Sequence, residues 1–190
     1  MEKLDITNYL YHGIVDWENY NNGKIRDDFC LDKLESILKS RYIYRPCEFK
    51  KHGINHDDYA NLYTFYFTFV ACHYNSIYAS KYKKDIKDDN GYLVATDYAK
   101  FGILFDIKLL NDLTICEYTF CDKEIVLEDD IPLDKYGVAI YINPIYVEEE
   151  IIKKISILLK KYDYNFNIVN VLDGSVIKLF NDEKIYSKTL

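Results

Sequence analysis

The chain has 190 residues, of which 49% are hydrophobic and 29% charged, and it carries 20 tyrosines, 10 phenylalanines and a net charge of −7. This composition excludes a disordered chain, and the acidic balance excludes a broad basic surface for nucleic-acid phosphates. Because the length fits one domain and no repeat or linker interrupts the sequence, we expect a single domain over residues 1–190.

The N-terminal segment, MEKLDITNYL, has acidic residues where a secretory signal would be basic. No stretch approaches the roughly 18 apolar residues of a membrane span. Five cysteines are an odd number, and they contain no C-x-x-C pair, which argues against both a disulfide framework and a four-cysteine zinc site. We therefore expect a soluble cytoplasmic protein with reduced thiols and no membrane contact.

The first predicted elements are a short strand at residues 8–14, a polar loop at 16–28 and a helix at 31–40. Asp32 is a suitable N-cap for this helix, and Glu35 follows it as in a capping box. The predicted apolar face of the helix consists of Leu34, Ile37 and Leu38. An extended segment at 41–45 ends before Pro46, and a polar loop is expected at 50–61.

The strongest predicted strand is at residues 62–71, where aromatic and β-branched side chains fill both faces. Such a strand belongs inside a sheet, with neighbours on both sides. A helix is predicted to follow at residues 73–84.

The second half of the chain is predicted to be rich in strands, at residues 92–95, 101–109, 114–121, 123–127 and 136–143. Residues 147–162 form the best amphipathic helix, with glutamates at its N-terminal end and lysines at its C-terminal end. Strands at 165–171 and 175–180 are joined by Asp173-Gly174, a hairpin signal. Together, the predicted elements indicate an α+β domain with a mostly antiparallel β-sheet, either continuous or split, flanked by a few helices.

A zinc site can be considered at His52 and His56, four residues apart, with Cys47 upstream and Cys72-His73 downstream. The spacing of four suits a metal only on a helix, whereas Gly53 and Asn55 indicate a loop. We therefore predict no metal site. Glycine-rich nucleotide motifs and the Gly-x-Ser-x-Gly hydrolase motif are absent from the sequence.

The order of motifs near the N-terminus is more informative. A strand with YHG at 11–13 is followed by a helix with LESILKS at 34–40 and an extended YIYR at 42–45. Here the chain resembles the ADP-ribosyltransferase superfamily, in the branch of the poly-ADP-ribose polymerases and DarT-type toxins. The segments FGILFD at 101–106 and KEIVLE at 123–128 are similar to those of uncharacterised relatives associated with abortive phage infection.

The resemblance implies an NAD site. His12 and the Gly13 backbone would contact NAD, Arg45 would reach a phosphate, and Tyr66 would stack on the nicotinamide. Glu124 or Glu128 would hydrogen-bond the ribose and stabilise the oxocarbenium-like transition state. The resemblance thus predicts a mono-ADP-ribosyltransferase that uses NAD, such as a toxin, an effector or a protein of phage conflict, with a protein or nucleic-acid acceptor.

A second hypothesis stays open at this point. The sequence lacks the glycine common in the family near Ser40-Arg41, and it has no clear Ser-Thr-Ser strand. Each proposed NAD contact also has an ordinary packing explanation. The alternative is therefore a noncatalytic interaction protein on the same scaffold, such as an antitoxin, defence regulator or anti-defence factor, whose acidic surface binds a basic protein partner.

Overall fold

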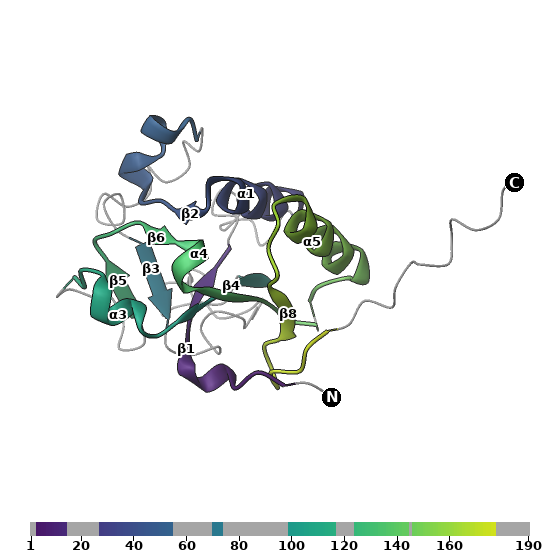
Figure 1. Cartoon of the computed structure of the whole chain (residues 1–190). Helices are drawn as coiled ribbons and strands as arrows, with labels where there is room; N and C mark the ends of the chain where they lie inside the picture. Colours follow the sequence, from purple (N-terminus) through teal and green to yellow (C-terminus); the bar gives the residue numbers. More distant parts are fainter. Residues whose placement is uncertain are drawn as a thin grey trace, which may run out of the picture.

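The structure is a computed structural model that describes residues 3–14, 27–54, 70–73, 99–116, 124–144 and 146–177. These residues form the predicted α+β architecture, in which α1 (Asp27–Ser40) and α5 (Glu149–Lys161) lie side by side above one sheet (Figure 1). The shorter helices are η1 (Ile6–Asn8), η3 (Pro46–Glu48), η4 (Lys50–His52), α3 (Leu109–Asp112) and α4 (Leu133–Tyr136).

The main sheet has the strand order β5-β3-β1-β4-β7-β8. Its strands are β1 (Tyr9–Gly13), β3 (Val70–His73), β4 (Phe101–Asp106), β5 (Glu124–Leu127), β7 (Gly137–Ile142) and β8 (Asn167–Asn170). All neighbours are antiparallel except β7 and β8, which are parallel and are connected through α5. Parallel strands need a long crossover connection, which is usually a helix. A second, two-stranded sheet pairs β2 (Tyr42–Ile43) with β6 (Ile131–Pro132), so the mostly antiparallel arrangement is confirmed.

Apolar side chains are buried on both faces of the main sheet. Alternate strand residues point to opposite faces, and two clusters of apolar side chains follow from this alternation. Leu10, Ile103 and Ile140 belong to the larger cluster, which includes residues of α1 and α5. Tyr11 and Tyr141 belong to the smaller one, where their rings pack 5.4 Å apart.

Gly102 in β4 lies at a point of very close packing. A Cβ atom on Gly102 would lie 2.2 Å from the backbone oxygen of His12 and 2.7 Å from the ring of Tyr141. Only glycine fits there without displacing backbone atoms. The glycine of the FGILFD segment is therefore required by the close packing of β4 against β1 and Tyr141.

The first helix begins earlier than the sequence predicted, at Asp27. Asp32 therefore lies inside the helix and is not its N-cap. Asp27 and Asp28 occupy the first turn, where the positive end of the helix dipole favours carboxylates. Cys30 and Leu31 extend the buried face toward the N-terminus, which explains why the helix can start before the predicted boundary.

Several other boundaries also differ. The 3-10 turn η4 replaces the start of the predicted loop at residues 50–61, and η3 precedes it at residues for which no element was predicted. His73 belongs to strand β3 and does not begin a helix, and the strand predicted at 101–109 ends at Asp106, before α3. Parts of other predicted elements lie outside the described residues: 16–26 of the loop predicted at 16–28, 62–69 of the strand at 62–71, 74–84 of the helix at 73–84, the whole strand at 92–95, and 178–180 of the strand at 175–180.

Candidate functional site

Strands β5, β3 and β1 lie next to one another in the sheet, although they are far apart in the sequence. Tyr11 in β1 pairs with His73 in β3, and His73 pairs with Glu124 in β5. The strand of the predicted NAD contacts and the strand of a predicted catalytic glutamate are thus separated by one strand.

His12 and Gly13 are partly buried residues at the end of β1. On the other side of β1, they pair with Ile103 and Gly102 of β4, so their backbone is fixed between two strands. Glu124 is the first residue of β5, and its backbone is described whereas its side chain is not. Tyr66 lies outside the described residues, and its predicted stacking on nicotinamide stays a prediction.

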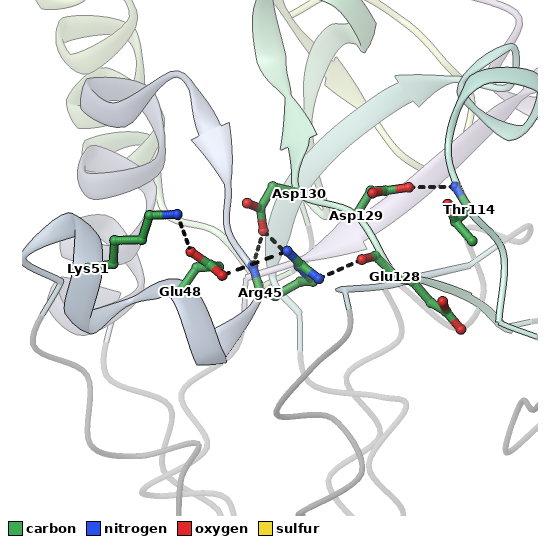
Figure 2. Close-up of polar contacts among 7 residues, drawn as sticks. All are labelled: Arg45, Glu48, Lys51, Thr114, Glu128, Asp129 and Asp130. Atoms are coloured by element: carbon green, nitrogen blue, oxygen red, sulfur yellow. Dashed lines mark hydrogen bonds and ion pairs between the residues drawn. The ribbon is translucent and has the colours of Figure 1, made fainter.

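Arg45 has several partners within the fold (Figure 2). Its backbone N–H and its Nε both donate to Oδ1 of Asp130, at 2.8 and 3.1 Å, and its Nη1 donates to the backbone oxygen of Glu128 at 2.7 Å. Its Nη2 has a longer contact, 3.9 Å, to Glu48. The guanidinium therefore connects the segment after β2 to the turn after β5. We name this cluster, Arg45 with Glu48 and residues 128–130, the Arg45 turn.

Neighbouring groups favour the charged forms of Arg45, Glu48 and Asp129. Partial burial lowers the pKa of Arg45, but the hydrogen bond and charge of Asp130 outweigh that effect and raise it. The hydrogen bond from Lys51 lowers the pKa of Glu48, and the backbone N–H of Thr114, 2.7 Å away, lowers the pKa of Asp129. The side chain of Glu128 is exposed. A phosphate on Arg45 would have to compete with Asp130 and the Glu128 carbonyl for Nε and Nη1.

Three parallel rings lie next to the Arg45 turn, and the sequence analysis missed them. The rings of Tyr42 and Tyr44 are stacked at 5.4 Å, and those of Tyr44 and His52 at 3.8 Å. Residues two apart in an extended segment share a face, so the pattern Tyr-x-Tyr was a usable signal for the first pair. The contact with His52 depends on the turns η3 and η4; the sequence had predicted a loop from residue 50 and no element at 46–48.

A groove of about 360 Å³ lies between α1 and α5, and it was also missed. Its lining residues are Asp28, Leu31, Asp32, Glu35, Lys154, Ile157 and Leu158. The three carboxylates recur at the i, i+4 and i+7 positions of α1, which places them on one side of that helix. This spacing is visible in the sequence, but only a helix that begins at Asp27 puts all three carboxylates in one stripe.

The histidine and cysteine residues considered for a metal do not meet in the described part of the chain, where no group of three or more metal-ligand side chains occurs. His52 is exposed and stacks on Tyr44, whereas His56 lies outside the described residues. Among the helices that the structure describes, none is long and apolar enough to cross a membrane.

Comparisons with models of protein families, with curated proteins and with solved structures find no match to this chain. The assignment of a function therefore depends on the geometry above and on the resemblance of the sequence motifs.

Proposed function

We propose that the chain is an NAD-using mono-ADP-ribosyltransferase whose site lies on the adjacent strands β1, β3 and β5. The observation that carries this proposal is the strand order β5-β3-β1, with Tyr11, His73 and Glu124 in register. The YHG strand and Glu124, which the sequence motifs nominated from positions more than 100 apart, thus lie on strands of one sheet that are separated only by β3. A cytoplasmic location, where NAD is abundant, is part of the proposal.

The proposed reaction breaks the bond between C1′ of the ribose and the nicotinamide nitrogen, and nicotinamide leaves with the bonding electron pair. An oxygen or nitrogen atom of the acceptor then bonds to C1′ and loses its proton to a base or to water. A carboxylate beside the ribose stabilises the positive charge that develops on the sugar, as preorganised charges do in other enzymes. His12 and the Gly13 backbone would hold the dinucleotide.

Of the two candidate glutamates, Glu124 has the better support. It lies within β5, in register with Tyr11 through His73. His12 is the next residue of β1 and belongs to the opposite face of the sheet from Tyr11, so one NAD molecule would have to pass over the end of β1 to reach both His12 and the Tyr11 row. Glu128 follows the end of β5, and its backbone N–H and carbonyl bind Thr114 and Arg45. We therefore assign the catalytic carboxylate to Glu124, and Glu128 is the matched comparison.

The test uses purified protein with NAD labelled on its adenine, in the presence of a lysate that supplies acceptors. Transfer of the label to lysate components, with at least about 100-fold less transfer by Glu124→Gln and a clear loss by His12→Ala, supports the proposal. Equal activity of Glu124→Gln and wild type would show that the carboxylate is wrongly assigned. If the protein neither binds NAD nor transfers the label, the proposed enzymatic function is wrong.

A noncatalytic interaction protein is the second candidate, and the Arg45 turn favours it. The guanidinium predicted to bind a phosphate already has Asp130 and the Glu128 carbonyl as close partners. An arginine with these contacts can have a purely structural role. On this hypothesis the chain retains its fold and binds a protein partner without consuming NAD.

A further inference from the structure

Helices α1 and α5 are parallel and in register along the groove between them. Asp28 of α1 is 3.9 Å from Lys154 of α5, and Glu35 is 2.6 Å from Lys161. Both partners advance by seven residues, or about two helical turns. The two ion pairs therefore mark two levels of one groove and fix the direction of the two helices.

Between these levels lies a carboxylate with no such partner. Within the described ranges, Asp32 takes part in neither an ion pair nor a side-chain hydrogen bond, and it lines the groove with the other two acidic residues of α1. Lys154 is the one cation in the lining, and it also binds Glu150 at 3.1 Å. The lining thus has three carboxylates against one ammonium, on a chain with a net charge of −7.

The same stretch of the groove exposes apolar surface. Ile157 of α5 is 62% exposed, the highest value among the large hydrophobic residues of the described part of the chain. Leu31 and Leu158 line the groove beside it. An isoleucine on an amphipathic helix is ordinarily directed toward a core, as Ile151 and Ile155 of the same helix are.

We propose that this groove binds an amphipathic helix of a partner protein, with lysine or arginine placed against Asp32 and an aliphatic residue placed against Ile157. Two helices side by side offer a third helix a row of side chains to pack against. The negative lining selects a cationic helix and disfavours an acidic one. The proposal goes beyond the NAD chemistry and does not depend on it, because none of the groove residues belongs to β1, β3 or β5.

The probe for the test is a fluorescein-labelled synthetic helix with leucine at heptad core positions and lysine beside them. Its control is the same peptide with glutamate in place of every lysine. Fluorescence anisotropy measures affinity, and amide chemical shifts of the ¹⁵N-labelled chain locate the contact. We expect the lysine peptide to bind, to shift the amides of α1 and α5, and to bind more weakly as salt concentration rises.

Matched variants separate the groove from general attraction to an acidic protein. Asp32→Asn removes one groove charge, and Glu149→Gln removes the same charge at an exposed position outside the lining. Ile157→Ser and Leu172→Ser each remove an exposed aliphatic side chain, inside and outside the groove respectively. We expect the combined groove variant to lose at least about tenfold in affinity, and the combined control variant to change by no more than about twofold.

Several outcomes would overturn the proposal. Equal losses in the two combined variants would mean that the attraction is general. No binding of the lysine peptide, or shifts confined to other elements, would also contradict it. A dimer in sedimentation velocity that Ile157→Ser dissociates would show that a second copy covers the groove. Circular dichroism of each variant verifies that its helices are intact, so that a loss is not due to unfolding.

Discussion

The Arg45 turn and the groove between α1 and α5 are both rich in charge, but their charges have different roles. In the Arg45 turn the side chains of Arg45 and Asp130 are only 27% and 22% exposed, and they bind each other and the backbone. In the groove, the side chain of Asp28 is 91% exposed and pairs with Lys154 at 3.9 Å, and Asp32 has no ion pair or side-chain hydrogen bond within the described part of the chain.

Charge alone therefore does not identify a binding site in this protein. The ionic hydrogen bonds of the Arg45 turn join segments 85 residues apart, so the fold itself accounts for them. No contact within the described fold explains the position of the Asp32 carboxylate in the groove or the exposure of Ile157. Substitutions in the two regions should therefore affect different properties, stability in the first region and binding in the second.

The largest effect on stability is expected from Arg45→Gln. The substitution leaves the Asp130 carboxylate and the Glu128 carbonyl without the guanidinium, and hydrogen bonds that involve charged groups contribute about 1.5–3 kcal/mol each. We expect the free energy of unfolding to fall by about 2 kcal/mol, measured by urea denaturation. Arg41→Gln is the matched control, because its ion pair with Asp134 is about half exposed and should contribute less than about 1 kcal/mol. Equal losses would remove the distinction between the two arginines.

The next effect concerns acid stability. The backbone N–H of Thr114 holds the pKa of Asp129 below its ordinary value of 3.8, so the ionised carboxylate stabilises the folded chain. This contribution is complete above the unfolded pKa and is lost as pH falls through the lower, folded pKa. We expect Asp129→Asn to be less stable than wild type at pH 6, and the difference to shrink below about pH 4. Unfolding curves between pH 2.5 and 7 measure this difference in stability. A difference that is independent of pH would contradict the lowered pKa of Asp129.

The smallest effects are expected in the groove. Asp32→Asn and Ile157→Ser change exposed side chains outside any hydrogen-bond network, so each should alter the free energy of unfolding by less than about 0.5 kcal/mol. Thermal and urea unfolding of the two variants check this. A loss of 2 kcal/mol in either variant would mean that the residue supports the fold, which would end the contrast with the Arg45 turn.

The sequence predicted those features that have a local pattern. The apolar repeat of residues 147–162 led to α5, and the short strand predicted at 8–14 corresponds to β1. The predicted start of α1 was wrong because two consecutive aspartates are as typical of a loop as of the first turn of a helix. The contact of Arg45 with Asp130 has no local signal, since the two residues are 85 apart. Strand order likewise depends on how distant segments pack, so no motif predicted that β3 would lie between β1 and β5.

The central claim is that NAD binds at the strands β1, β3 and β5 and loses its nicotinamide there. The most direct measurement is the rate of nicotinamide release from NAD by the wild-type chain, by Glu124→Gln and by Glu128→Gln, with lysate acceptors present. We predict release by wild type, a rate lower by at least about 100-fold for Glu124→Gln, and a rate within about fivefold of wild type for Glu128→Gln. No release above the rate in the absence of protein, together with no binding of NAD, would contradict the account.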